Sequence, residues 1–133
     1  SHVVRFIYGR RMSLQAINYR DSWNRYAKIW KLEGTEAKLE ACAEILVPSV
    51  VYTDPLTQRN GWHDLAAYMV EFHQQVPGGH FVTKAFKAHS GRSVAQWEMV
   101  NGDGTVMGNG TSYAEYRADG KLTAMTGFFD PQS

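Results

Sequence analysis

A chain of 133 residues fits one domain and is long enough to bury a core without metals or disulfides. Its hydrophobic content of 44%, charged content of 20% and formal net charge of +1 are those of an ordinary globular protein and differ from the basic excess of a nucleic-acid binder. The single cysteine, Cys42, excludes an intrachain disulfide and sites built on paired thiols. No apolar run approaches the ~20 residues of a membrane span. We therefore expect a protein of the reducing cytoplasm with no membrane or nucleic-acid partner.

Helical periodicity marks three segments in the first half of the chain. Apolar side chains recur at steps of three and four from Ser13, the predicted cap, to about Leu32. A second helix is predicted from a cap at Thr35 to a stop at Pro48. A third is predicted over about 61–76, where the apolar stripe ends at Pro-Gly-Gly. Between the second and third helices a short run of β-formers predicts one strand.

The organisation of the chain is that of one unit. The first helical pattern begins directly after Met12, so we interpret residues 1–11 as a tag or an N-terminal extension. Residues 12–133 contain no linker, repeat or low-complexity stretch, and we expect them to form a single domain.

The second half of the chain alternates between β-formers and turn residues. Hairpin signals at Ser90-Gly91, at 101–104 and at Asp119-Gly120 divide it into four predicted strands. The strands cover His80–Ala88, Arg92–Val100, Thr105–Arg117 and Lys121–Phe129. Since helices come first and antiparallel strands last, the predicted class is α+β. A long curled antiparallel sheet around three helices forms a cone, whose interior suits a pocket for a small hydrophobic molecule.

Strand alternation predicts which side chains face that interior. Trp97 and Met99 share one face of their strand, and Met125 and Phe129 share one face of the last strand. The other face of the last strand is also apolar. We therefore expect a homodimer formed through the sheet.

Asp54 is the first candidate for chemistry. It follows a short strand and lies two positions after Tyr52, so both side chains point the same way. A carboxylate beside an apolar cavity is desolvated and can exchange protons near neutral pH. The alternative is that Asp54-Pro55 only forms a turn, since aspartate commonly starts one.

His80 is the second candidate, because it opens a predicted strand directly after a Gly-Gly turn. It suits a general acid or base, and the alternative is a surface histidine at a strand end. The five histidines show no metal-ligand spacing, and the chain has no serine-hydrolase elbow or phosphate-binding loop. We expect no metal and no cofactor.

The order of these elements resembles the nuclear-transport-factor-2-like superfamily, and in particular its SnoaL-like and ketosteroid-isomerase-like members. The resemblance covers Met12 to Pro131 and implies a cystatin-like α+β barrel. Asp54-Pro55 is similar to the Asp-Pro that carries the base of ketosteroid isomerase, and Arg25-Tyr26 to the dipeptide whose tyrosine donates to the oxyanion. Ser112 stands where that enzyme has its second donor, an aspartic acid.

A second member contributes a different likeness. His80-Phe81 resembles the catalytic His-Phe of scytalone dehydratase, whose pocket serine falls near Ser112. Trp97 stands where that enzyme has its second catalytic histidine. The resemblance therefore implies the fold and a pocket but a mixed set of site residues.

Three functions remain open from the sequence. The first is an isomerase, dehydratase or cyclase in which Asp54 is the base, His80 its partner and Tyr26 the donor to an enolate oxygen. The second is a binding protein for a small hydrophobic metabolite, and the third an interaction domain whose cone is filled. The substrate-binding residues we expect are Trp30, Tyr52, Trp97, Met99, Ser112, Met125 and Phe129.

Overall fold

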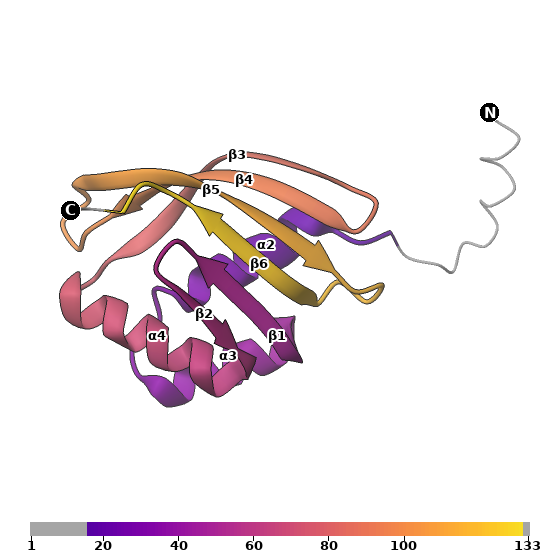
Figure 1. Ribbon diagram of the computed structural model, residues 1–133, viewed down its shortest axis with the longest axis horizontal. Coiled ribbons are helices and arrows are strands. Elements are labelled where there is room, and N and C mark those ends of the chain that lie inside the picture. The colour runs from indigo at the N-terminus through magenta and orange to yellow at the C-terminus, as the bar shows by residue number, and fades with distance from the viewer. Residues whose placement is uncertain (1–15, 132–133) are drawn as a thin grey trace, which may run out of the picture.

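The protein is described by a computed structural model that covers residues 16–131 (Figure 1). Its helices are α2 (Tyr19–Ile29), α3 (Thr35–Ile45) and α4 (Gly61–Gln75). The predicted extension over 1–11 and the predicted cap at Ser13 lie outside the described residues. The observed cap of α2 is Asn18, whose side-chain oxygen accepts the amide of Asp21 at 3.0 Å.

Helix α3 begins and ends differently from the prediction. Thr35 is its first helical residue and not its cap, because the preceding Gly34, with φ of 88°, makes the turn between the two helices. The helix already ends at Ile45, and Leu46 begins an extended strand. Pro48 therefore lies inside that strand, at a break in its pairing where a missing amide is tolerated.

Six strands form one sheet, against which the three helices pack. The strand predicted to be short is nine residues long. A second strand of four residues, which was not predicted from the sequence, pairs with it through a tight turn. The four predicted strands of the second half are present, and each bound agrees with the prediction to within one residue. The strands are β1 (Leu46–Asp54), β2 (Thr57–Asn60), β3 (His80–His89), β4 (Arg92–Val100), β5 (Val106–Tyr116) and β6 (Leu122–Phe128).

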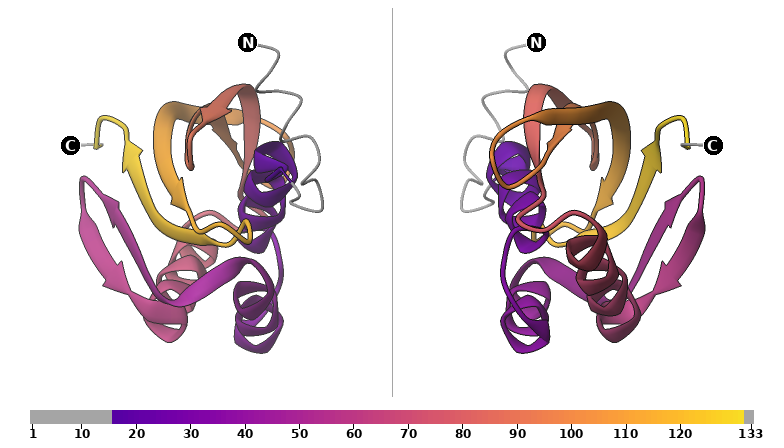
Figure 2. Two further views of the ribbon diagram at one scale, coloured as in Figure 1. Left: turned by 90° about the vertical axis from the view of Figure 1, so that its right-hand side faces the viewer. Right: turned by 90° about the vertical axis from the view of Figure 1, so that its left-hand side faces the viewer.

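The sheet is curved and open, in the order β2-β1-β6-β5-β4-β3. It curls around α2, while α3 and α4 lie across the part built from β1 (Figure 2). The cone-shaped α+β class is as predicted. The sheet is nevertheless mixed, because β1 pairs with β6 in parallel, with Tyr52 opposite Met125. Helix α4 and four further strands separate β1 from β6 in the chain, which gives the length that a parallel connection needs.

The core lies between the helices and the concave face of the sheet. Ile29, Leu65 and Met125, from α2, α4 and β6, are at most 1% exposed. Cys42 is also buried there as a free thiol, and burial raises its pKa to about 11, so it stays protonated and unreactive. None of the helices in residues 16–131 is long and apolar enough to span a bilayer.

Candidate active site

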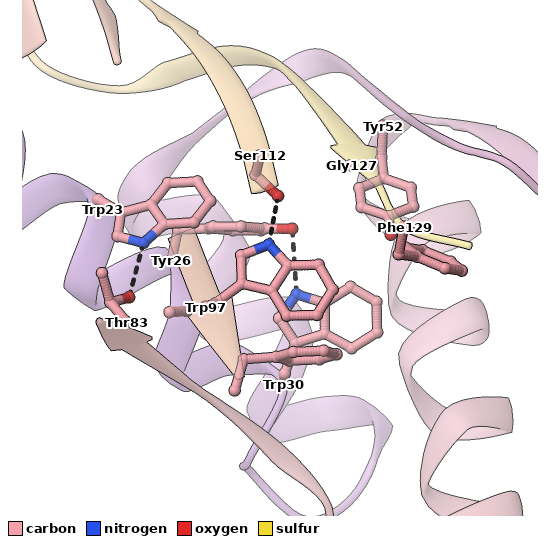
Figure 3. A pocket seen from close by; sticks show the side chains of 11 residues that line it. Trp23, Tyr26, Trp30, Tyr52, Thr83, Trp97, Ser112, Gly127 and Phe129 are labelled. Atoms are coloured by element: carbon pink, nitrogen blue, oxygen red, sulfur yellow. Dashed lines mark hydrogen bonds between the residues drawn. The ribbon is translucent and has the colours of Figure 1, made fainter. Parts of the chain in front are cut away.

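A pocket opens between α2 and the concave face of the sheet (Figure 3). Its cavity volume is about 50 Å³, enough for a few waters at roughly 10–15 Å³ each, whereas a drug-sized ligand takes roughly 300–1,000 Å³. A large ligand therefore requires the aromatic walls to move. The residues that line the pocket are Trp23, Tyr26, Ala27, Trp30, Tyr52, Phe81, Thr83, Trp97, Ser112, Gly127 and Phe129.

The pocket carries three pairs of an indole and a hydroxyl. The indole N–H of Trp30 donates to the Tyr26 hydroxyl at 3.0 Å. That of Trp97 donates to the Ser112 hydroxyl at 2.9 Å, and that of Trp23 to the Thr83 hydroxyl at 3.0 Å. An indole can only donate, so each hydroxyl oxygen accepts one bond and keeps its own proton.

Two of these hydroxyls are suited to hold an oxygen of a ligand. Among the described residues, neither the Tyr26 nor the Ser112 proton has an acceptor, although both side chains line the pocket. Burial raises the pKa of Tyr26 well above its usual value, which keeps its hydroxyl neutral and therefore a donor. The pair can donate to a carbonyl oxygen, as an oxyanion-stabilising site requires.

Asp54 lies behind the pocket wall, 8% exposed, with both carboxylate oxygens hydrogen-bonded. One oxygen accepts the amides of Leu56 at 2.8 Å and Thr57 at 3.1 Å, which makes the turn between β1 and β2. The other accepts the hydroxyls of Tyr52 and Tyr68, each at 2.7 Å. Tyr52 lines the pocket, so its hydroxyl links Asp54 to the interior. The turn interpretation is therefore correct for one oxygen, and the other oxygen is free of the backbone.

Tyr68 is a functional candidate that the sequence analysis missed. It lies on α4, three residues after Leu65 and four before Phe72, so the helical spacing already put it on the inner stripe. The guanidinium of Arg59 lies 4.6 Å from the centre of its ring and reaches Glu71 at 3.5 Å. Burial and the Asp54 carboxylate raise the pKa of Tyr68, which keeps it a neutral donor to that carboxylate.

Most of the site residues expected from the sequence come together in this pocket, and three do not. Tyr26, Trp30, Tyr52, Trp97, Ser112 and Phe129 line it, and Asp54 lies directly behind it. Trp30, Trp97 and Phe129 surround the cavity and leave it open. An interaction domain would have required these side chains to fill it.

The three others lie elsewhere for identifiable reasons. His80 is not a lining residue, because its neighbour Phe81 points into the pocket and successive side chains of a strand alternate; its Nδ1 lies 3.1 Å from the Gly78 carbonyl oxygen. Met125 has the inward parity predicted for it but is 1% exposed within the core below the pocket. Met99 is half-buried and does not line the pocket; it lies two residues after Trp97 on β4, opposite Phe81.

Trp23, Phe81 and Thr83 line the pocket without having been expected there. Trp23 precedes Tyr26 and Trp30 at helical spacing, so the stripe that predicted those two also indicated it. Phe81 and Thr83 have equal parity on β3, and the irregularity between Thr83 and Ala85 returns Phe86 to the inner face. Strand alternation in the sequence does not predict where such an irregularity occurs.

The Trp97 indole occupies space that is open only because residue 110 is a glycine. A Cβ at Gly110 would lie 2.5 Å from Cζ2 of Trp97 and 2.6 Å from the Phe128 carbonyl oxygen. We expect Gly110→Ala to displace the indole, break its bond to Ser112 and destabilise the protein by about 1–3 kcal/mol. The measurements are the thermal midpoint and the indole ¹⁵N–¹H signal of Trp97. Gly108→Ala is the control, since a Cβ there meets nothing within 4 Å; equal behaviour of the two variants would contradict this account.

Acidic and thiol groups do not assemble into a metal site in the part of the chain that the structure describes. Within residues 16–131, no three histidine, cysteine, aspartate or glutamate side chains gather closely enough to hold a metal ion. The polar chemistry of the pocket is that of tyrosine, serine and threonine hydroxyls with one carboxylate behind them.

Comparison with known proteins agrees with this architecture. A proposed isomerase of the SnoaL-like family from Agrobacterium tumefaciens superposes with a TM-score of 0.78 at 24% identity, over 85% of this chain and 97% of that one. An NTF2-like protein of unknown function from Cytophaga hutchinsonii gives 0.66 at 14% identity, over 88% and 94%. A proposed polyketide cyclase from Sinorhizobium meliloti gives 0.65 at 13% identity, over 80% and 93%.

At these identities the structural matches establish the fold, and the sequence itself establishes the family. A search of curated proteins returns no match. The family description "SnoaL-like domain" matches residues 19–125, which include all three helices and most of the sheet. The chain therefore belongs to the SnoaL-like domain family and shares its fold with NTF2-like proteins.

Proposed function

We propose that this SnoaL-like protein is an enzyme that moves a proton next to a carbonyl group of a small hydrophobic molecule, without a cofactor, as an isomerase, cyclase or dehydratase does. The observation that carries the proposal is the 2.7 Å bond between the pocket hydroxyl of Tyr52 and the buried carboxylate of Asp54. The pairing of a base with separate hydroxyl donors in one apolar pocket supports it. The functions suggested for two structural neighbours, a proposed isomerase and a proposed polyketide cyclase, agree with it.

The proton would leave the substrate through Tyr52. As the substrate proton reaches the Tyr52 oxygen, the Tyr52 proton moves to the Asp54 oxygen that already accepts it. Burial raises the pKa of Tyr52, so a free tyrosinate is unfavourable and the two transfers are expected to be concerted. The electron pair left on carbon moves to the carbonyl oxygen, which Tyr26 and Ser112 hold by their free protons.

A small unsaturated ketone tests the proposal without knowledge of the natural substrate. 3-Cyclohexen-1-one becomes the conjugated 2-cyclohexen-1-one when one proton is removed beside the carbonyl and one is returned at the far end. Ultraviolet absorbance of the conjugated product gives the rate. We expect the protein to raise the rate above that of buffer, and Tyr26→Phe with Ser112→Ala to lower it. A rate equal to that of buffer at millimolar ketone would sink the proposal.

A binding protein without catalysis is the second candidate, and one observation favours it. The Asp54 carboxylate accepts four hydrogen bonds, from Tyr52, Tyr68, Leu56 and Thr57, and so has no vacant lone pair in this conformation. In that case the pocket holds a small apolar ligand that emerges unchanged. Ligand binding with no conversion, in wild type and in Asp54→Asn alike, would establish this alternative.

We further propose that the protein forms a homodimer through the outer face of the sheet. Exposed apolar side chains on this face support it: Val82, Val94 and Phe128 are 38%, 45% and 58% exposed. We expect Phe128→Arg to convert a dimer into a monomer in size-exclusion chromatography with light scattering. Leu56→Arg is the control, because Leu56 is 65% exposed in the turn after β1, away from this face. An identical mass for both variants and the wild type would refute the proposed interface.

A further inference from the structure

Gly127 leaves a small space where the polar groups of the site meet. A Cβ at this position would lie 3.7 Å from the Asp54 Cβ, 3.7 Å from the Ser112 Oγ and 3.9 Å from the Tyr52 Oη. The pairing of the strands explains the meeting. Ser112 is directly opposite Gly127 on β5, and the parallel pairing of β1 with β6 brings Asp54 to its other side. The methyl-sized space at Gly127 is therefore bordered by groups from both neighbouring strands, β5 and β1.

The fold does not need a glycine at this point. Gly127 is not among the glycines with positive φ, and its three nearest contacts are at ordinary van der Waals distance. The contrast with other glycines is clear: a Cβ at Gly110 or at Gly79 would meet a neighbouring side chain at 2.5 or 2.7 Å. An alanine fits at position 127 without strain, so neither backbone nor packing accounts for the space.

The groups around the space define what it accepts. The Ser112 oxygen accepts a hydrogen bond from the Trp97 indole, so its own proton is available to donate to a further acceptor. The Tyr52 oxygen lies beside the same space and is bonded to Asp54. An aromatic wall, including Trp97 and Phe129, surrounds the remainder. A flat apolar ring with one acceptor oxygen at its edge matches this arrangement.

We propose that Gly127 is a specificity-determining residue, and that the space it leaves seats the oxygen-bearing carbon of a small cyclic carbonyl compound. The inference rests on the proposed function, because it names the substrate class of the same pocket. It also makes a separate claim, that the size of one side chain on β6 decides whether this class of compound binds at all.

Cyclohexanone is a direct probe, and the tryptophans report on it. Trp97 donates to Ser112 at the seat, whereas the Trp62 indole donates to the Leu46 carbonyl outside the pocket and serves as an internal reference. We expect cyclohexanone to shift the indole ¹⁵N–¹H signal of Trp97 saturably and to leave that of Trp62 in place. Gly127→Ala should weaken this binding by about tenfold or more, the usual effect of one added methyl in a fitted pocket, with a thermal midpoint no lower than that of wild type.

Two further proteins complete the test. Gly108→Ala, which adds the same methyl where nothing lies within 4 Å, should bind cyclohexanone as the wild type does. Ser112→Ala, which removes the donor and keeps the space, should also lose the Trp97 shift, and it tests the seat independently if Gly127→Ala does not fold. Unweakened binding by Gly127→Ala, or no Trp97 shift in the wild type, overturns the inference. Binding of cyclohexanone without conversion of 3-cyclohexen-1-one overturns the enzymatic proposal alone.

Discussion

Replacing Asp54 with asparagine is expected to slow the conversion of 3-cyclohexen-1-one by at least roughly a hundredfold, the usual scale of a lost general base. The asparagine oxygen still accepts the amides of Leu56 and Thr57, so the turn after β1 is retained. Its amide nitrogen replaces the oxygen that accepts Tyr52 and Tyr68, and this nitrogen cannot take up a proton. Initial rates of the ultraviolet assay, at several ketone concentrations, measure the effect.

The matched control is Asp64→Asn. Asp64 accepts the backbone amide of Asn60 at 3.0 Å and is 47% exposed on its side chain, outside the pocket. It therefore undergoes the same chemical change in the same part of the fold and should keep the wild-type rate. If a folded Asp54→Asn variant converts the ketone as fast as Asp64→Asn does, the carboxylate serves only the turn and its two tyrosines.

The largest loss of stability is expected for Lys38→Met. Lys38 is 0% exposed, and its ammonium donates to the carbonyls of Ile29 at 3.0 Å, Trp30 at 3.5 Å and Leu32 at 2.6 Å. These carbonyls lie at the end of α2, where Ile29 also accepts the amide of Leu32 at 3.2 Å, whereas Trp30 and Leu32 lie beyond the last helical residue. Hydrogen bonds from a charged group are worth roughly 1.5–3 kcal/mol each in favourable cases, and Lys38→Met removes the ammonium from all three carbonyls, so we expect a loss of about 3 kcal/mol.

Thermal and urea unfolding measure that loss, which corresponds to a midpoint lower by about 10 °C for a domain of this size. Lys31→Met is the control, because Lys31 is exposed at the same end of α2 and its replacement removes the same charge for the same side chain. A surface substitution of this kind changes stability by less than about 0.5 kcal/mol. Equal stability of the two variants would show that the Lys38 ammonium does not stabilise the end of α2.

The sequence was sufficient to predict the elements whose signal is local. The helical stripe over 61–76 and the hairpin signals between the last four strands were confirmed to within about one residue. The strand over Thr57–Asn60 was not predicted, because its four residues are all polar and carry no apolar alternation that distinguishes a strand from a turn. The parallel pairing of β1 with β6 also has no local signal, since it joins residues that are far apart in the chain.

The residues of the candidate site also divide into those that the sequence predicts and those that only tertiary packing determines. Trp97 was predicted from strand parity, Ser112 from the family resemblance and Tyr52 from its position two residues before Asp54, and the pocket contains all three. His80 did not join them, since the parity that turns Phe81 inward turns its neighbour away. The hydrogen bond from Tyr68 to Asp54 depends on how α4 lies across β1, which only tertiary packing determines.

The place of β6 between β1 and β5 has a consequence for how the protein matures. This strand comes after the other five in chain order, yet it carries Gly127 and joins the strand of Asp54 to the strand of Ser112. Until it is inserted, the β1–β2 hairpin and the β3–β5 meander are two separate sheets with unpaired edges, which is the kind of surface that associates wrongly. The pocket wall is therefore completed in one step, when β6 is inserted, and a ligand of the proposed pocket would favour the finished sheet over the two separate sheets.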